Sequence, residues 1–420
     1  MDTLTAPGTG VSADELTRLE TTVAAGLPAF LEELERLCRI DCGSYSPAGV
    51  NEVADRVARA FRDLEAEVER RPDPTERYGD TVIGTFRGRT GAGPRLLLVG
   101  HMDTVFPDGT AAERPFRIED RIAHGPGVTD MKSGLLAGIH ALAALRALGG
   151  GDGEAWLRLP FEQLTYIANP DEEIGSPSST PHIREFAATA DATLVLECAR
   201  ANGDFVTSRK GIADLRLVVR GRAAHAGVEP EKGRNAILAG ARIVERVQAL
   251  TGRWPGVTAN VGVFRSGTRP NVVPDLAELE LDVRGVTRTE LEAAVAAIQA
   301  IAAEPGVPDV TVEIEEMAGW LPMEKLERSG RLADTVIALA ARLGFSTRDV
   351  ATGGASDANT TSGMGVPSID GLGPIGGRDH SPDEYLEVDS IVPRTTLLAA
   401  LLLAVGRDPV VAGWRADRSA

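Results

Sequence analysis

The sequence predicts an α/β fold in which a catalytic domain with a mostly parallel sheet is interrupted by an inserted ferredoxin-like α+β domain. Three observations support this prediction. The chain has 420 residues, more than one hydrophobic core usually serves, so two domains are expected. Short apolar runs alternate with helical patterns in its first and last parts, as in α/β proteins. Between them, residues 210–316 show the order βαββαβ, which is typical of a ferredoxin-like sandwich.

The chain begins with a tail and two helical patterns. Residues 1–12 contain proline and glycine and are expected to form a flexible tail. In residues 13–39, apolar side chains recur every three or four positions, which predicts an amphipathic helix that could break near Pro28. A second helical pattern covers residues 50–64.

Short apolar runs then predict the strands of the catalytic sheet. Residues 95–99 are predominantly apolar, as expected for a strand buried on both faces of a sheet. Residues 133–148 form a helical pattern that ends in three glycines. The expected strands are 81–86, 95–99, 164–168 and 193–196.

The inserted ferredoxin-like domain is expected at residues 209–318, which leaves 13–208 and 319–420 for the catalytic domain. After the insert, helical patterns return at 332–343 and 391–405. The expected strands of the insert are 212–219, 257–264, 277–283 and 310–314, and its expected helices are 235–250 and 289–302.

The composition excludes several classes of partner. The chain has 44 Lys+Arg against 61 Asp+Glu, a formal net charge of −17, whereas nucleic acids and anionic membranes are bound through an excess of positive charge. No apolar run approaches the roughly 20 residues that cross a membrane, and no secretory signal pattern is found. Three cysteines do not suggest a disulfide framework. We therefore expect a cytoplasmic protein with no nucleic-acid or membrane partner.

The residues that suggest a chemistry stand at the ends of predicted strands. His101 and Asp103 follow the buried strand 95–99, and the alternation of side chains along a strand would turn them to the same side. A metal-bound histidine commonly donates its second N–H to a carboxylate, which Asp103 could provide. Taken alone, the pair would more often form an ordinary turn.

Acidic residues gather at further strand ends. Glu172 and Glu173 belong to three consecutive acids after a buried strand, a placement that is electrostatically costly without a cation. Glu197 closes another apolar strand. Asp130 precedes a helix, where an N-cap is its alternative role. His380 lies in a glycine-rich loop far downstream.

Together these positions offer two imidazoles and four carboxylates, with no thiolate. Such donors suit Zn²⁺, Mn²⁺ or Co²⁺, and a shared carboxylate would allow two ions about 3.5 Å apart. The composition of the set favours a two-metal hydrolytic site, although spacing alone does not show that its members converge. The set is His101, Asp130, Glu172, Glu173, Glu197 and His380.

Six segments of the sequence carry a resemblance to a known family. They are His101-Met102-Asp103-Thr104-Val105, Asp130-Met131-Lys132-Ser133-Gly134, Asp171-Glu172-Glu173-Ile174-Gly175, Glu197, His225-Ala226-Gly227 and His380-Ser381. In this order they resemble the dinuclear zinc peptidase and amidohydrolase family. That family includes glutamate carboxypeptidase of the G type, aminoacylase, acetylornithine deacetylase and succinyl-diaminopimelate desuccinylase.

The resemblance implies a centre with two Zn²⁺ per subunit, for which Co²⁺ or Mn²⁺ are alternatives. One carboxylate in the family bridges the two ions. Here the bridging residue would be Asp130, with His101 and Glu197 completing one site and Glu173 and His380 completing the other.

The same resemblance assigns catalytic roles. Glu172 would be the general base while metal-bound hydroxide attacks the amide carbonyl, and Asp103 would orient His101. In the family, the histidine that matches His225 reaches from the inserted domain into the partner subunit's site and polarises the carbonyl. The insert at 209–318 therefore resembles the family's dimerisation, or lid, domain, and a homodimer formed through it is expected.

The resemblance also implies positions that bind substrate. Arginine suits a planar carboxylate through paired N–H bonds, and glycine lets backbone amides approach a ligand. One departure is that glutamate carboxypeptidases of the family carry an arginine near the end of the last strand of the insert, where this chain reads EEMAGW at 315–320. Arg209-Lys210 could substitute for it. The implied substrate-binding residues are Asn271, Arg284, Lys210, Gly353 and Gly354.

We therefore predict a zinc-dependent metallopeptidase or amidohydrolase. It would cleave an amide bond, in a small peptide or an N-acyl amino acid, next to a free carboxylate, as a glutamate carboxypeptidase does. An N-acyl-amino-acid deacylase is the alternative with the same metal core and a different pocket. A non-catalytic binding member of the family is a third interpretation, against which the intact Glu172 and ligand positions weigh.

Overall fold

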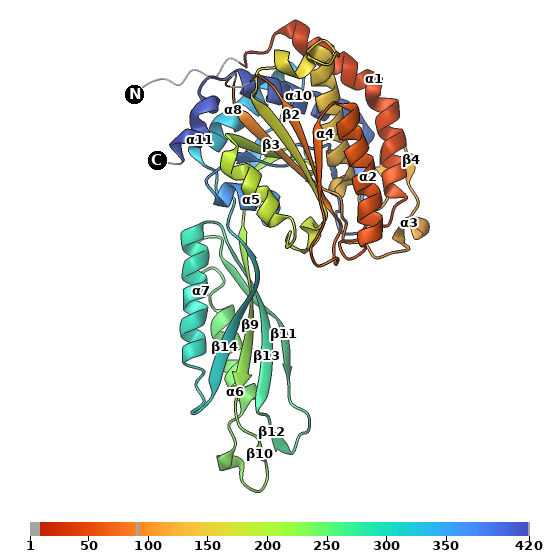
Figure 1. Cartoon of the computed structure of the whole chain (residues 1–420). Coiled ribbons are helices and arrows are strands. Elements are labelled where there is room, and N and C mark those ends of the chain that lie inside the picture. The colour runs from red at the N-terminus through yellow and green to blue at the C-terminus, as the bar shows by residue number, and fades with distance from the viewer. Residues whose placement is uncertain (1–8, 90, 92, 419–420) are drawn as a thin grey trace. The chain divides into compact units, whose positions relative to one another are not determined.

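The computed structural model describes residues 9–89, 91 and 93–418, which divide into two compact units (Figure 1). Unit 2 consists of Ser208–Glu324 and Thr352–Ala355, and unit 1 contains the other described residues. Unit 2 thus differs from the expected insert at 209–318 in two respects. It extends further at its C-terminal end, where its last strand continues to Trp320, and it includes a second, four-residue segment.

Unit 1 is built on a six-stranded sheet with the order β1-β2-β6-β3-β7-β16 (Figure 1). The strands are β1 (Glu67–Arg71), β2 (Thr81–Arg87), β3 (Arg95–His101), β6 (Gln163–Asn169), β7 (Ala192–Val195) and β16 (Ser368–Ile369). The pairs from β6 to β16 are parallel, whereas β1 and β2 form an antiparallel pair that joins β6 antiparallel. The prediction of a mostly parallel sheet is confirmed.

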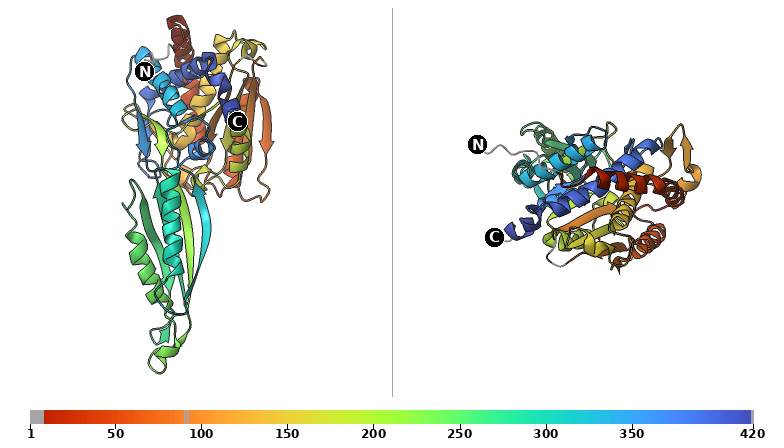
Figure 2. Two further views of the ribbon diagram at one scale, coloured as in Figure 1. Left: turned by 90° about the vertical axis from the view of Figure 1, so that its left-hand side faces the viewer. Right: turned by 90° about the horizontal axis from the view of Figure 1, so that it is seen from above.

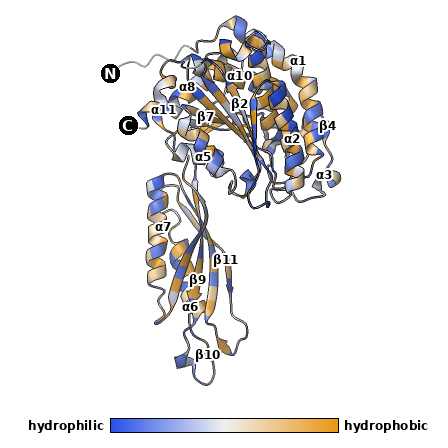
Figure 3. Cartoon of the chain, viewed as in Figure 1, coloured by the Kyte–Doolittle hydropathy of each residue, from blue (hydrophilic) through white to orange (hydrophobic). Residues whose placement is uncertain are grey.

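Helices cover both faces of this sheet. They are α1 (Ala13–Cys38), α2 (Pro47–Asp63), α4 (Ser133–Leu148), α5 (Thr180–Thr189), α8 (Glu327–Arg342), α9 (Asp357–Gly363) and α10 (Ile391–Arg407). Leu96 and Leu98 of β3 join a core with Phe61 of α2 and Leu135 of α4. The alternate residues of β3 face the other side, where α5 packs against β3 and α9 against β7 and β16. Figure 3 shows how apolar these strands are.

The first helix is continuous, so the expected break near Pro28 is wrong. Val23 and Phe30, on either side of the proline, are both buried in the core. A proline inside a helix costs about 3 kcal/mol, and the burial of the helix on both sides of it outweighs this cost.

The expected flexible tail is described only from residue 9 onward, and residues 1–8 lie outside the described residues. Val11 is buried, and Arg407 donates a hydrogen bond to the carbonyl oxygen of Gly10 (2.7 Å). Ser12 then forms a capping box with Glu15 at the start of α1. The residues just before the helix are therefore held to unit 1.

One helical window, Val388–Arg407, would be long and apolar enough to cross a membrane by length and composition, with a mean hydropathy of 1.6; the described residues contain no second one. However, 83% of that window is buried inside the protein. It contains α10, which packs against α1, α4 and α8. This burial is typical of the central helix of a folded core.

A small antiparallel sheet in unit 1 has the order β17-β18-β5-β4. Its strands are β4 (Arg117–Glu119), β5 (Ile122–His124), β17 (Gly376–Gly377) and β18 (Tyr385–Glu387). The hairpin of β17 and β18 carries His380 in its loop, and β18 pairs with β5, which lies shortly before Asp130 in the chain. The shorter elements of unit 1 include α3 (Thr110–Glu113), α11 (Trp414–Asp417) and the turns η1 (Val128–Lys132) and η3 (Glu172–Ile174).

Unit 2 has the predicted βαββαβ order of a ferredoxin-like fold. Its elements are β9 (Gly211–Arg220), α6 (Ala236–Gln248), β11 (Thr258–Ser266), β13 (Leu276–Gly285), α7 (Arg288–Ala303) and β14 (Thr311–Trp320). The antiparallel sheet has the order β11-β13-β9-β14, and both helices pack on the same face of it (Figure 2). A further pair in this unit is β10 (Ala224–His225) with β12 (Val272–Val273). β8 (Phe205–Arg209) pairs with β15 (Asp349–Thr352), and most residues of these two strands belong to unit 1.

Candidate metal centre

Three parallel strands bring the predicted donors to one edge of the sheet of unit 1. β3 lies between β6 and β7, and their carboxyl ends therefore point the same way. His101 is the last residue of β3, Glu172 and Glu173 follow β6, and Glu197 follows β7. The geometry of the parallel sheet thus places these four side chains together.

The other two donors come from turns. Asp130 lies in η1, which leads into α4, and His380 lies in the loop between β17 and β18. The peptide bond between Asp130 and Met131 is cis. These turns bring the two side chains to the donors at the sheet edge.

Asp130 lies between the two imidazoles. Its Oδ1 is 3.1 Å from Nε2 of His101, and its Oδ2 is 3.1 Å from Nε2 of His380. Each of these nitrogens also faces a glutamate, at 3.6 Å from Oε1 of Glu197 and 3.1 Å from Oε2 of Glu173. One carboxylate therefore joins two sets of donors, each with one histidine and one glutamate.

Asp103 stands behind His101. Nδ1 of His101 is 3.0 Å from the backbone oxygen of Asp103 and 3.3 Å from its Oδ1. The carboxylate of Asp103 accepts hydrogen bonds from Ser44 Oγ (2.6 Å) and from the backbone N–H groups of Glu172 (3.1 Å) and Glu173 (3.2 Å). Asp103 thus fixes both the imidazole and the turn that carries the two glutamates.

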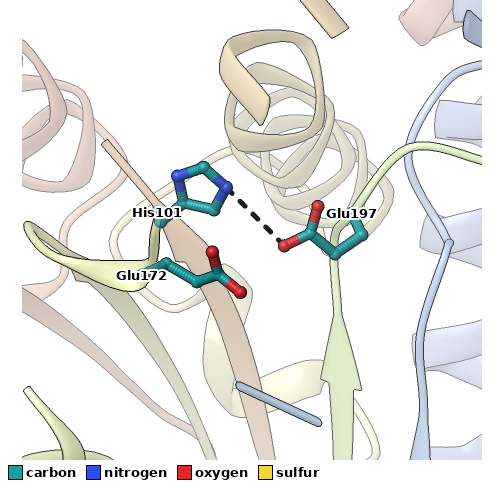
Figure 4. A group of neighbouring side chains, drawn as sticks. All are labelled: His101, Glu172 and Glu197. Atoms are coloured by element: carbon teal, nitrogen blue, oxygen red, sulfur yellow. Dashed lines mark ion pairs between the residues drawn. The ribbon is translucent and has the colours of Figure 1, made fainter. Parts of the chain in front are cut away.

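Glu172 points toward the donors without bonding to them. One of its carboxylate oxygens lies within 4.8 Å of donor atoms of His101 and Glu197. Figure 4 shows the three side chains pointing toward one another. Its side chain is buried, and among the described residues it makes no hydrogen bond. A buried carboxylate that has no fixed partner is available to take and release a proton.

The pKa shifts of the cluster favour the binding of positive charge, either as protons or as cations. Burial raises the pKa of Glu172 well above its usual value, and burial raises that of Glu173 to about 7. Hydrogen bonds to Asp130 and Glu173 raise the pKa of His380 to about 10. Burial would raise the pKa of Asp130, but hydrogen bonds from His101 and His380 outweigh it and keep that pKa low. In the metal-free protein, protons supply the charge that cations would otherwise supply.

The donors fit a bound metal ion. Two groups, His101 with Glu172 and Glu197, and His101 with Asp130 and Glu173, each place their donor atoms within 4.8 Å of one another. Two ligands at about 2.1 Å from a tetrahedral zinc ion lie about 3.4 Å apart. The nitrogen-to-oxygen distances around Asp130, from 3.1 to 3.6 Å, are close to that value.

The predicted residues of unit 2 form two groups. His225 in β10 is exposed, and the backbone N–H of Gly227 donates to its Nδ1 (3.1 Å), which leaves the imidazole proton on Nε2. Asn271 is its neighbour, because the backbone oxygen of Asn271 accepts the N–H of Ala226 (3.0 Å). This first group lies next to the beginning of β13.

The second group lies at the other end of β13. Arg284 donates from Nη1 to the carbonyl oxygen of Gly353 (3.0 Å) and from Nη2 to the carboxylate of Asp282 (2.8 Å). The backbone N–H of Lys210 donates to the carbonyl oxygen of Thr352 (3.3 Å), which directly precedes Gly353 and Gly354. A strand advances about 3.3 Å per residue, so β13 separates the two groups by about 25 Å. Within one unit 2, His225 and Arg284 are therefore not brought together.

Comparisons with known proteins decide the family. Residues 97–404 match the description "Peptidase family M20/M25/M40". The chain belongs to this family. Its members hydrolyse amide bonds and use metal ions, so this chain is an M20 metallohydrolase with a donor cluster that can bind metal.

Several M20 relatives are similar over nearly the whole chain. Carboxypeptidase G2 of Pseudomonas sp. (strain RS-16) is 30% identical over 385 residues, which are 90% of each chain. Succinyl-diaminopimelate desuccinylase of Corynebacterium glutamicum is 27% identical over 85% of this chain and 92% of its own. Among solved structures, aminopeptidase PepT from Bacillus cereus has a TM-score of 0.74 at 24% identity, covering 91% of this chain and 99% of its own, and it supports the fold.

Sequence reasoning missed three buried charged groups around the M20 donor cluster. Glu384 bonds to the turn of Asp130, Asp357 begins α9, and Lys132 donates from Nζ to two backbone carbonyl oxygens. No periodicity or strand end marks these residues. Lys132 stands in a segment that carries the family resemblance and Asp357 directly follows the glycine-rich loop before α9, but neither was given a role, and Glu384 was marked only by lying four residues after His380.

Proposed function

We propose that this M20 enzyme is a two-metal hydrolase that cleaves an amide bond next to a free carboxylate, in the manner of a glutamate carboxypeptidase. The position of Asp130 carries the proposal, because each of its oxygens lies 3.1 Å from a different imidazole. A carboxylate shared in this way suits two ions. The similarity to carboxypeptidase G2 supports this branch of the family.

The proposed ligands follow from the two donor sets. His101 and Glu197 would hold one ion, His380 and Glu173 would hold the other, and Asp130 would bind both. Histidine and carboxylate donors without thiolate suit Zn²⁺, with Co²⁺ or Mn²⁺ as alternatives.

The proposed chemistry is hydrolysis by an activated water. Bound metal ions would lower the pKa of that water and polarise the amide carbonyl. Glu172 would take the proton of the attacking water on a carboxylate oxygen and pass it to the leaving nitrogen. Asp103 would keep the proton on Nδ1 of His101, which directs Nε2 toward the donor cluster.

Unit 2 would supply groups that contact the substrate. Asn271, Arg284, Lys210, Gly353 and Gly354 would bind its free carboxylate and neighbouring atoms. The guanidinium of Arg284 is already held by Asp282 and Gly353, which fixes its direction but shares its charge. His225 would donate its Nε2 proton to the carbonyl oxygen as charge develops there.

We further propose a homodimer formed through unit 2. Apolar side chains are exposed along the start of α6 and the adjacent edge strand β11. Phe264 is 40% exposed and lies against Gly240 of α6. A sheet edge with exposed apolar residues is typical of an interface. The members of this apolar patch are Ile237, Leu238 and Phe264.

An N-acyl-amino-acid deacylase is the second candidate, which the similarity to succinyl-diaminopimelate desuccinylase favours. It would use the same donors on a different acyl group.

We also propose that the enzyme acts in the cytoplasm. Cys38, Cys42 and Cys198 are free and buried, which agrees with a reducing compartment.

A substrate panel on the zinc-loaded protein tests the proposal and separates the two candidates. It would combine N-benzoyl-glutamate, N-succinyl and N-acetyl amino acids, and the same compounds with the carboxylate amidated. We expect hydrolysis only where the carboxylate is free, and loss of activity after chelation. Equal turnover of the amidated compounds, or activity that survives complete metal removal, would refute the proposed function.

A further inference from the structure

We propose that Glu384 is a positioning residue, which ties the turn that carries Asp130 to the hairpin that carries His380 and so sets the spacing of the metal donors. The inference rests on the proposed metal centre. It concerns a side chain that is not itself a donor and that no feature of the sequence singled out.

Glu384 is buried, with 2% of its surface exposed, and both oxygens of its carboxylate accept hydrogen bonds from backbone N–H groups. Oε2 accepts the N–H of Gly127 (2.9 Å). Oε1 accepts those of Thr129 (2.8 Å) and Asp130 (3.0 Å). Three backbone N–H groups of one turn, including that of the bridging residue Asp130, thus donate to a single carboxylate.

The other end of Glu384 is fixed just as firmly. It stands four residues after His380 and directly before β18. Its backbone oxygen lies 3.0 Å from Nδ1 of His124, and β18 pairs with β5 at His124. The side chain therefore links two segments that are more than 250 residues apart in the chain and that each provide a metal donor.

The side chain of Thr129 in the turn also packs against the backbone of the hairpin. A Cβ added at Gly376 in β17 would lie 1.9 Å from Oγ1 of Thr129, so only glycine allows this approach. Thr129 is completely buried. Because the two segments are packed without spare room, the hydrogen bonds of Glu384 determine the position of Asp130 relative to His380.

The direction of the Asp130 carboxylate follows from this anchor. Its two oxygens meet Nε2 of His101 and Nε2 of His380 at 3.1 Å each, and a small rotation of the turn would lengthen one distance or the other. Groups that orient metal ligands typically change metal affinity by about 10- to 100-fold when they are removed. Since Asp130 faces both donor sets, loss of the anchor should weaken both together.

Glu384→Ala and Glu384→Gln test the proposal by metal binding rather than by activity. The alanine variant removes all three acceptor contacts. The glutamine variant keeps one carbonyl oxygen but turns an NH₂ group toward another donor. We expect the affinity of the metal-free protein for Zn²⁺, measured by competition with a chromophoric chelator, to fall by about 10- to 100-fold in the alanine variant and by less in the glutamine variant. The visible absorption of the Co²⁺-loaded protein should change in both.

Asp73→Asn is the matched control. Asp73 is also buried and accepts backbone N–H groups from Arg77 (3.0 Å) and Tyr78 (3.3 Å), but it contacts none of the metal donors. This variant should lower the melting temperature while leaving the Zn²⁺ affinity and the Co²⁺ spectrum unchanged. If it weakened Zn²⁺ binding as much as Glu384→Ala does, the effect would be one of general stability and the proposal would fail.

The remaining outcomes separate this inference from the proposed function. A folded Glu384 variant with wild-type Zn²⁺ affinity and Co²⁺ spectrum overturns the inference alone. Absence of metal binding by the wild-type protein overturns both. If the alanine variant does not fold, the glutamine variant decides, because faster amide hydrogen exchange in residues 127–130, with the rest of unit 1 unchanged, is expected from it. Unchanged exchange there would contradict the anchor.

Discussion

Asp130 and Glu172 are both buried carboxylates within one cluster, yet their surroundings give them different chemistry. Asp130 accepts hydrogen bonds from the imidazoles of His101 and His380, which keep its pKa low. Glu172 has no hydrogen-bond partner for its side chain among the described residues, and burial raises its pKa. The first arrangement suits a permanent anion that binds cations, and the second suits a group that carries a proton for part of a cycle.

Replacing Glu172 tests this distinction. In Glu172→Ala we expect both metals to remain and turnover to fall by about 10²- to 10⁴-fold, because the proton carrier is lost while the proposed ligands stay. Metal content by mass spectrometry and kcat for the best substrate of the panel provide the measurement. Glu172→Gln, which leaves no cavity, is the control. Near-normal kcat would refute the role as base, and loss of one metal would identify Glu172 as a ligand.

Metal affinity should rise with pH. In the metal-free protein the pKa of His380 is raised to about 10 and that of Glu173 to about 7, so at neutral pH the histidine is protonated and the glutamate partly so. A metal ion must displace these protons, and affinity gains about tenfold per pH unit for each proton released. Calorimetric Zn²⁺ titrations in two buffers of different ionisation enthalpy measure the release. An affinity that stays constant between about pH 6 and 8 would contradict the assignment.

The sequence allowed the donors to be predicted because strand ends have a fixed place in a parallel sheet. His101 and Glu197 close apolar runs, so their convergence follows from the topology. Glu384 could not be found in this way. Its partners are the backbone N–H groups of Gly127, Thr129 and Asp130, more than 250 residues away. Because almost every residue has a backbone N–H, the sequence does not indicate which of them bind a side chain.

At the level of elements, α10 also holds the segment that precedes the hairpin of His380. Its Arg394 is 1% exposed and donates to the carbonyl oxygens of Gly371 (2.6 Å), Gly373 (3.1 Å) and Gly203 (3.1 Å). Burial lowers the pKa of this guanidinium to about 10, so it remains charged at neutral pH. The segment that leads into the hairpin of His380 is thereby attached to the central helix.

Arg394→Met should therefore destabilise unit 1. Each buried carbonyl left without its donor costs about 1–3 kcal/mol, and at least two are affected, so we expect a loss of at least about 2 kcal/mol. Urea unfolding followed by circular dichroism measures it. Arg121→Met, which removes an exposed ion pair with Asp389, should change stability little. Equal midpoints for the two variants would contradict the role of Arg394.

Element types were predicted more reliably than their interruptions. The helical pattern around Pro28 was correct, but the expected break was not, because the cost of a proline is local whereas the burial of Val23 and Phe30 depends on the rest of the core. The small sheet that carries His380 has strands of two or three residues, too short for any period to show.

At the scale of the whole molecule, the separation of His225 from Arg284 along β13 has a consequence for assembly. If both act on one substrate, one of them must come from another subunit. We expect His225→Ala to lower kcat without loss of metal, and mixed dimers of His225→Ala with Glu172→Ala to regain part of the activity. Rates of purified mixed dimers, beside each parent variant, provide the measurement. No recovery in verified mixed dimers would exclude a shared site.

The apolar patch of unit 2 gives a second assembly prediction. Phe264→Glu places a charge in this patch and should shift the protein from dimer to monomer, since a buried unpaired charge is costly at an interface. Light scattering coupled to size exclusion measures the mass. Val410→Glu, at an exposed apolar position of unit 1, is the control and should leave the mass unchanged. A wild-type protein that is monomeric at all concentrations would contradict the proposed dimer.

The chain crosses between the two units four times, because unit 2 includes the short segment Thr352–Ala355 as well as its main stretch. A single genetic deletion therefore cannot remove unit 2 cleanly. Cutting out Ser208–Glu324 would leave behind Gly353 and Gly354 without the arginine side chains that bond to them. For exchange of this unit between relatives, two separate segments would have to be grafted together, because a graft of only the longer one would lack Gly353 and Gly354.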